Sequence, residues 1–241
     1  MFNPVTEVRS FLRAALVTQV PRDHRDPDHV LRRRRVVCAL TLLVGGALLW
    51  WSLQLAPGDP LFYAGTAALA LTWLGGALLS GPIHLGRGNT RSGRAYTRPV
   101  LQSLCLGGLL LAIFLAGAVV VAQVPVLAEP VDDLLDHARF GSLPVVLALT
   151  LLNGVAEETF FRGALYAAIP VRWTIGVTTV VYALTTVVSG VPLLVFAAVC
   201  LGLLCALQRR VTGGVLGPII THITWSGGML LLLPPLLQIL R

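Results

Sequence analysis

Lysine is absent from this 241-residue chain, and charged residues of all kinds make up only 12% of it. Soluble domains carry about 25% charged residues. Hydrophobic residues account for 56% of the sequence, and its mean hydropathy is +0.81. This composition excludes an ordinary soluble domain and indicates an integral membrane protein.

All 18 basic residues are arginine, and they give a formal net charge of +7. The arginines lie mainly beside apolar segments, not on a basic face with interleaved aromatic residues, so we expect no nucleic-acid partner. In a membrane protein such an excess indicates orientation, because arginine-rich loops stay in the cytosol.

Cysteine is also scarce. Cys38, Cys105, Cys200 and Cys205 lie inside apolar runs and show no Cys-x-x-Cys spacing. That placement favours small buried hydrophobic side chains over disulfides or a metal site.

The apolar segments predict an all-α fold, a polytopic transmembrane bundle of about eight helices. Roughly 20 apolar residues are needed to cross a bilayer as a helix. The expected spans are 36–56, 61–80, 100–124 and 143–169, then the shorter 174–188, 191–207, 211–225 and 228–240. Segment 81–99 is expected to be a basic loop and 125–142 an acidic one. A seven-span version stays open because the last segment is short.

Residues 1–35 form the expected cytosolic N-terminal region, followed by a three-helix membrane region (36–142) and a catalytic membrane region (143–241). Val5, Val8 and Leu12 recur at helical spacing near the N-terminus, which predicts an amphipathic helix on the membrane surface. Eight spans with both termini in the cytosol place sixteen of the eighteen arginines there. We expect a bacterial plasma membrane protein in contact with the lipid bilayer.

Three charged residues interrupt the fourth span, Glu157, Glu158 and Arg162. A charge at the centre of a membrane helix costs about 3 kcal/mol on insertion scales, so intramembrane charges mark functional sites. A purely architectural buried network is the alternative. Glu158 and Arg162 are four residues apart, the spacing of a helical ion pair, which leaves Glu157 without a local partner. Asn153 shares the helix face of Glu157 and could orient a carboxylate or a water.

Other polar residues reach a similar depth in their own spans. Glu157, Thr186 and His222 lie 13, 12 and 9 residues from the cytosolic ends of their segments. These separations correspond to depths of roughly 20, 18 and 14 Å. The sequence therefore predicts that the three side chains meet in one cavity open to the cytosol.

The pattern Glu157-Glu158-x-x-x-Arg162, followed by Gly163, resembles the first motif of the CPBP family, the CAAX protease and bacteriocin-processing (Abi) enzymes. The downstream Gly213, Gly214, Pro218 and His222 resemble its last motif. The resemblance implies an intramembrane endopeptidase of about eight helices. Its type II CAAX members cleave prenylated C-terminal peptides at the cytosolic side.

The resemblance implies that Glu157 is the base that activates water, that Glu158 and Arg162 support it, and that His222 helps bind the oxyanion. The chain departs from the family at Thr186, where relatives carry histidine, and at Ser226, where they carry asparagine or aspartate. A zinc site would retain only His222 and the carboxylates, so we expect no metal and no other cofactor.

The leading hypothesis is an endopeptidase that cleaves a membrane-tethered peptide or protein by glutamate-activated water. Because Thr186 replaces a histidine, the alternative is a catalytically inactive scaffold or chaperone that binds a membrane-protein partner. A proton-coupled transporter using Glu157 is a third interpretation, although the two halves of the chain show no convincing internal similarity.

Overall fold

Helices make up most of the structure, a computed structural model that describes residues 3–21, 26–90 and 96–240. The elements are α1 (Pro4–Leu16), α2 (Asp28–Leu53), α3 (Pro60–Ser80), β1 (Gly88–Asn89), β2 (Tyr96–Thr97), α4 (Val100–Val121), α5 (Pro125–Arg139), α6 (Leu143–Glu158), the π-helical stretch η1 (Thr159–Leu165), α7 (Tyr166–Ala168), α8 (Thr174–Val187), α9 (Pro192–Thr212) and α10 (Leu216–Leu240). The predicted all-α polytopic bundle is confirmed.

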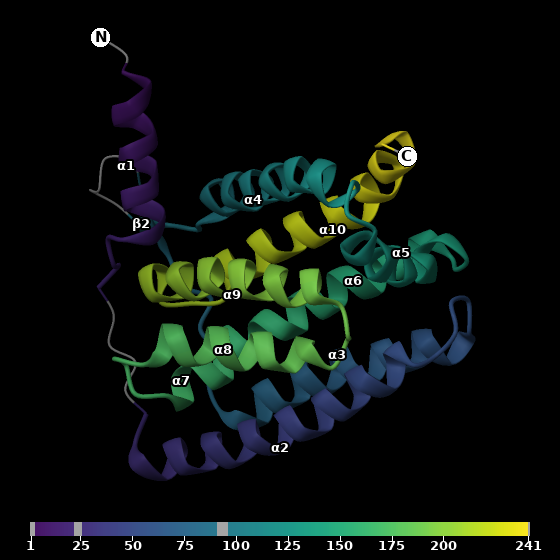
Figure 1. Ribbon diagram of the computed structural model, residues 1–241. Helices are drawn as coiled ribbons and strands as arrows, with labels where there is room; N and C mark the ends of the chain where they lie inside the picture. The colour runs from purple at the N-terminus through teal and green to yellow at the C-terminus, as the bar shows by residue number, and fades with distance from the viewer. Residues whose placement is uncertain (1–2, 22–25, 91–95, 241) are drawn as a thin grey trace.

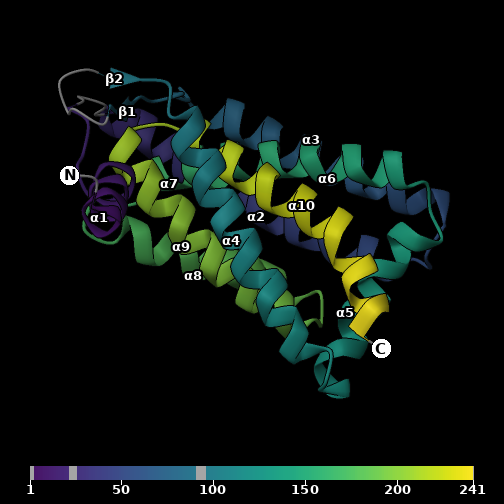
Figure 2. The ribbon, with the colours of Figure 1, turned by 90° about the horizontal axis from the view of Figure 1, so that it is seen from above.

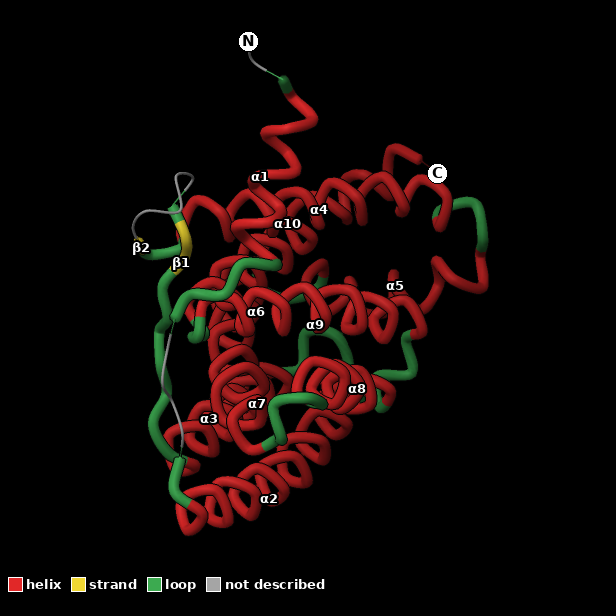
Figure 3. The backbone as a smooth tube through the Cα atoms, turned by 90° about the vertical axis from the view of Figure 1, so that its left-hand side faces the viewer, coloured by secondary structure: helices red, strands yellow, loops and turns green. Residues whose placement is uncertain are grey.

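The long helices pack as antiparallel or parallel neighbours around one central helix (Figures 1 and 2). α2 packs on α3, α8 on α9, and α4 on α10. The continuous helix formed by α6, η1 and α7 contacts α3 and α10 through α6, and α2, α8 and α9 through its second half. Figure 3 shows α7 between α2, α3 and α8 when the bundle is seen from one end. The charged motif therefore lies at the most enclosed part of this helix, since every residue of η1 is buried.

An aromatic core surrounds the charged helix. The Trp73 ring of α3 packs on Phe160 and Phe161 at centroid distances of 5.0 and 5.2 Å, and all three side chains are buried. Cys38 is buried in the same core, as expected, whereas Cys105 is exposed on α4. Large apolar side chains on the outer helix faces are exposed, as expected for contact with lipid.

Six helices of the described chain are long and apolar enough to cross a membrane, and the shorter α8 accompanies them. The expected spans 211–225 and 228–240 are not separate, because α10 continues through Ser226, Gly227 and Gly228. Glycines in a membrane helix favour close helix packing and need not end it. The described bundle thus has seven helices running between its two ends rather than eight.

Because an odd number of helices runs between the two ends of the bundle, the described chain starts at one end and finishes at the other. α1 and the C-terminal end of α10 lie at opposite ends of the bundle in both ribbon views (Figures 1 and 2). The expectation that both termini share the cytosolic side rested on a turn near Gly227, and α10 has no such turn. The cytosolic assignment of either end stays a prediction.

The end that carries α1 also carries most of the described arginines, and we call it the arginine-rich end. They lie on α1, on the first turns of α2, in the hairpin segment 81–99, before α8 and at the end of α9, and are Arg9, Arg13, Arg32, Arg33, Arg34, Arg35, Arg87, Arg98, Arg172, Arg209 and Arg210. The helix α2 begins at Asp28 and so includes the arginines expected to precede the first span. This charge distribution favours a cytosolic arginine-rich end.

The predicted acidic loop at the other end is a helix, α5. Apolar residues recur along it at helical spacing, and Ala128 and Leu135 are buried. Leu135 packs in a cluster with Leu233 and Leu237 of α10. Its acidic residues and Pro130 indicated a loop, but an amphipathic helix can carry acids on its outer face.

The amphipathic helix predicted near the N-terminus is present as α1, and its place on a membrane surface stays a prediction. Asn3 accepts hydrogen bonds from the backbone N–H groups of Val5 and Thr6, and Pro4 occupies the first helical turn. The helix runs roughly across the direction of the bundle helices (Figures 1 and 2). Its Val5 and Val8 side chains are 75% and 58% exposed, as a helix at a membrane surface requires.

Candidate active site

The two glutamates lie where the central helix changes its winding. Glu157 and Glu158 are the last residues of α6, and the π-helical η1 begins at Thr159. Short π-helical stretches inside α-helices occur frequently at functional sites. Glu158 is fully buried, whereas Glu157 is half-buried. The two adjacent carboxylates therefore have different surroundings.

Glu158 is held by two partners on one oxygen. Its Oε1 accepts a hydrogen bond from Nη1 of Arg162 at 2.9 Å, the ion pair expected from their spacing. Nδ1 of His222, on α10, lies 2.8 Å from the same oxygen. Glu158 thus joins η1 to α10, and with Arg162 it forms a compensated pair with no exposed surface.

Glu157 has a partner of its own that the sequence interpretation missed. The Tyr182 hydroxyl, on α8, donates a hydrogen bond of 2.7 Å to Oε2 of Glu157. Tyr182 precedes Thr186 by one helical turn, so both lie on the same face of α8. The signal available in the sequence was Tyr182 itself, a polar aromatic residue four positions before Thr186, where the family resemblance predicts a histidine.

Arg162 connects the two carboxylate environments. Its guanidinium lies over the Tyr182 ring, 4.6 Å from the ring centre, while it binds Glu158. Its backbone oxygen accepts a hydrogen bond of 2.7 Å from Nε of Arg209 on α9. A Cβ at Gly202 would lie 3.2 Å from both Arg162 and Tyr182, so this glycine leaves room for the stack.

Glycine also permits the approach of α10. A Cβ built on Gly154 would lie 3.3 Å from the His222 ring and 3.1 Å from Ile223. Contacts this short are tighter than ordinary van der Waals contacts. Gly154 therefore helps to bring His222 onto the face of α6 that carries Glu158.

Three further predicted site residues form no hydrogen bond with the glutamates in the described chain. Thr186 donates to the backbone oxygen of Ala183 in its own helix. Asn153 donates to the backbone oxygens of Thr66 and Leu149, and so ties α6 to α3 without contacting Glu157. Ser226 has a buried hydroxyl with no hydrogen-bond partner among the residues that the structure describes. The structure thus joins five side chains in one network, Glu157, Glu158, Arg162, Tyr182 and His222.

Several atoms around this network retain unused hydrogen-bonding capacity. Within the described chain, no partner is found for Oε2 of Glu158, for Nε and Nη2 of Arg162, or for the Thr179 hydroxyl, although all are buried. Such atoms are costly unless a water or a ligand satisfies them. No group of three or more His, Cys, Asp or Glu side chains suited to a metal occurs in the described ranges.

Residues 139–228 match the family model described as type II CAAX prenyl endopeptidase Rce1-like. This segment is Rce1-like. The match covers the whole network and confirms the resemblance to the CPBP family that the glutamate motif indicated. No curated protein and no solved structure matches the chain. The Rce1-like segment runs from the end of α5 to the middle of α10 and thus includes every helix that contributes a network side chain.

Proposed function

We propose that this protein is an intramembrane endopeptidase in which Glu157 activates a water molecule. The observation that carries the proposal is the difference between the bonding partners of the two adjacent carboxylates. Glu158 is neutralised by Arg162 and bound to His222, while among the described residues Glu157 makes a single hydrogen bond, to the uncharged Tyr182. A carboxylate without a salt-bridge partner retains the capacity to accept a proton.

The proposed reaction needs no covalent intermediate. Glu157 accepts a proton from water as the water oxygen bonds to the scissile carbonyl carbon, which becomes tetrahedral. Glu157 then passes this proton to the leaving nitrogen as the C–N bond breaks, giving a carboxylic acid and an amine. The carbonyl oxygen becomes negatively charged in between, so a donor placed at that point lowers the barrier.

His222 is the proposed donor to this oxyanion. Its Nδ1 faces a carboxylate oxygen of Glu158 and therefore carries a hydrogen, which fixes the ring orientation. Among the described residues, the side-chain hydrogen bond of His222 involves Nδ1 and leaves Nε2 for a substrate. The proposed role requires a hydrogen on Nε2, which would be donated to the oxyanion while Nδ1 stays bonded to Glu158.

Tyr182 is the proposed positioning residue for Glu157. Its hydroxyl fixes one carboxylate oxygen and leaves the other for water. Thr186, which stands where relatives carry histidine, satisfies its hydroxyl within its own helix. Tyr182 therefore supplies the polar contact from α8 that Thr186 does not make.

The family description supports a prenylated, membrane-tethered peptide as the substrate. A prenyl chain would keep such a peptide in the bilayer, close to the half-buried Glu157. Entry from the arginine-rich end fits the depth of the network, because His222 lies near the start of α10 and Tyr182 in the middle of α8.

The test uses the purified full chain in lipid nanodiscs with a prenylated peptide, and the shortened product is measured by mass spectrometry. Glu157→Gln should lower the cleavage rate by about 10²-fold or more, the usual contribution of a general base. Glu129→Gln makes the same chemical change on an exposed residue of α5 and should leave the rate unchanged. Equal cleavage by Glu157→Gln and the wild type would refute the proposal.

The contacts of Thr186 favour one alternative, an inactive membrane scaffold. If the missing histidine is essential, neither the wild type nor Glu157→Gln will cleave any prenylated peptide. A membrane-protein partner should then co-purify equally with both forms. Cleavage by the wild type alone would exclude this alternative.

A further inference from the structure

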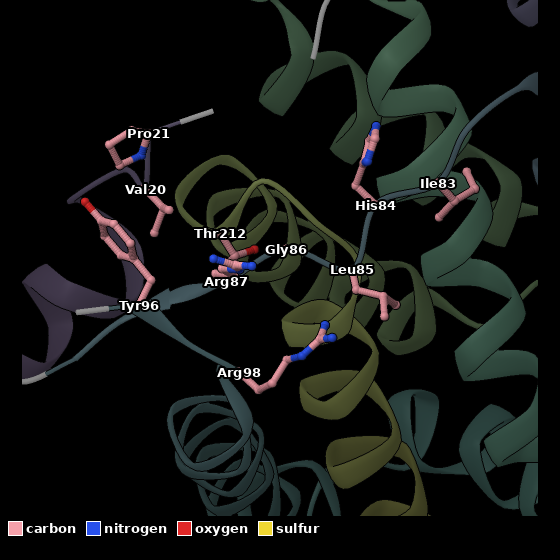
Figure 4. Close-up of a pocket in the computed structure, with 10 residues that line it drawn as sticks. All are labelled: Val20, Pro21, Ile83, His84, Leu85, Gly86, Arg87, Tyr96, Arg98 and Thr212. Atoms are coloured by element: carbon pink, nitrogen blue, oxygen red, sulfur yellow. The ribbon is translucent and has the colours of Figure 1, made fainter. Parts of the chain in front are cut away.

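A second charged site lies at the arginine-rich end, outside the glutamate network. It is a pocket of about 490 Å³ between the N-terminal segment, the hairpin and the turn before α10. Ten residues line it, namely Val20, Pro21, Ile83, His84, Leu85, Gly86, Arg87, Tyr96, Arg98 and Thr212. Figure 4 shows Val20 and Pro21 on one side and Ile83 and His84 on the other, with Arg87 and Arg98 between them.

Backbone hydrogen bonds build this pocket from segments far apart in the sequence. The N–H of Val20 donates to the oxygen of Val211, and that of Arg87 donates to the oxygen of Thr212. The N–H of Leu216 donates to the oxygen of Leu85. The pocket is therefore held together by main-chain hydrogen bonds between its segments.

Two glycines allow the segments to meet. Gly86 has a φ of +79°, a conformation that favours glycine, and a side chain at Gly214 would collide with the backbone of Leu85 and Gly86. Gly214 follows Gly213, which ends α9 in the left-handed conformation with a φ of +71°. The Gly213-Gly214 pair thus shapes this pocket.

The lining combines cationic and apolar groups. Arg87 and Arg98 are exposed, and within the described chain their guanidinium groups form no ion pair. None of the ten lining residues is acidic, and Val20, Ile83 and Leu85 provide apolar surface. Guanidinium groups match the geometry of phosphate oxygens and can bind two of them at once.

The position of the pocket in the fold favours a phosphate group that belongs to a lipid. The pocket lies where α3 and α9 end and α4 begins, so it lies at the depth where apolar spans meet the headgroup region. The Val20–Pro21 wall continues from α1, whose exposed apolar side chains fit a membrane surface. The helix ends and the wall that continues from α1 both indicate that a ligand in this pocket would lie beside lipid.

We propose that Arg87 and Arg98 bind the phosphate of an anionic phospholipid headgroup at the membrane surface. The acyl chains would lie against the exposed apolar residues at the start of α4, where Leu101 is 74% exposed. Anionic lipid is favoured over zwitterionic lipid because two guanidinium groups without an ion pair among the described residues attract net negative charge. This site is independent of the endopeptidase proposal.

Native mass spectrometry of the full chain in detergent can test the site with phosphatidylglycerol and phosphatidylcholine of equal chain length. The double variant Arg87→Gln/Arg98→Gln should weaken phosphatidylglycerol binding by about tenfold. The matched control Arg33→Gln/Arg172→Gln removes the same charge from exposed residues of the same end and should weaken it by less than about twofold.

Three results would overturn the proposal. Equal losses in the two double variants would indicate general electrostatic attraction. Equal binding of both lipids to the wild type would show that the pocket does not select negative charge. Displacement of phosphatidylglycerol by millimolar inorganic phosphate would indicate a site for a small free anion. Both variants change exposed side chains, and unchanged thermal unfolding will show that each remains folded.

Discussion

The two sides of the glutamate network differ in how their charge is compensated. On the Glu158 side, a fully buried carboxylate shares one oxygen between Arg162 and His222. On the Glu157 side, a half-buried carboxylate has only the Tyr182 hydroxyl as a hydrogen-bond partner in the part of the chain that the structure describes. Adjacent residues of the same type can thus serve different purposes, one fixing the helices and the other available for chemistry.

The largest expected effect on stability comes from removing the Arg162 cation that pairs with Glu158. Arg162→Leu leaves a buried carboxylate without its cation and should lower the free energy of unfolding by about 3–5 kcal/mol. Unfolding by denaturant in mixed micelles measures this change. The double variant Glu158→Gln/Arg162→Leu removes both charges and should recover much of the loss. A single variant within about 1 kcal/mol of the wild type would contradict the assigned role of the pair.

A smaller effect is expected on the Glu157 side. Tyr182→Phe keeps the ring beneath Arg162 but removes the hydroxyl, so the folded state should persist while the carboxylate loses its fixed orientation. We expect the cleavage rate to fall about tenfold, the equivalent of one hydrogen bond to a charged group. The rate and the thermal unfolding midpoint should be measured together. A fall in the midpoint with an unchanged rate would assign Tyr182 a structural role only.

The smallest effect on cleavage and stability is expected for Thr186, one helical turn after Tyr182 in α8. Thr186→Val preserves the shape of the side chain and removes only a hydroxyl bonded to its own helix. Cleavage and stability should both stay close to the wild type, with stability within about 0.5 kcal/mol. The same assay then compares two hydroxyl deletions on one helix face. A larger loss for Thr186→Val than for Tyr182→Phe would reverse the proposed assignment.

The local part of this arrangement could be predicted from the sequence. Glu158 and Arg162 lie on one helix, so their spacing alone predicts their contact. The partners of Glu157 and of the His222 ring depend on how α8 and α10 pack against α6, and no local pattern records that packing. The π-helical winding after Glu158 likewise has no signal in residue type or spacing.

The fold shows the same limit. The length of an apolar segment predicts a membrane helix because the thickness of the bilayer sets the number of residues required to cross it. It does not show whether Gly227 and Gly228 end a helix or permit close packing inside one, and here α10 continues. The helix α5 escaped prediction because its acidic residues and Pro130 resemble a loop.

The most direct test of the central claim compares Glu157→Gln with Glu158→Gln, measuring the cleavage rate per folded molecule and the thermal unfolding midpoint of each. Glu157→Gln should retain the midpoint and lose cleavage, whereas Glu158→Gln should lower the midpoint because Arg162 loses its buried anion. The opposite outcome, an active Glu157→Gln variant and a stable but inactive Glu158→Gln variant, would show that the wrong glutamate has been named as the base.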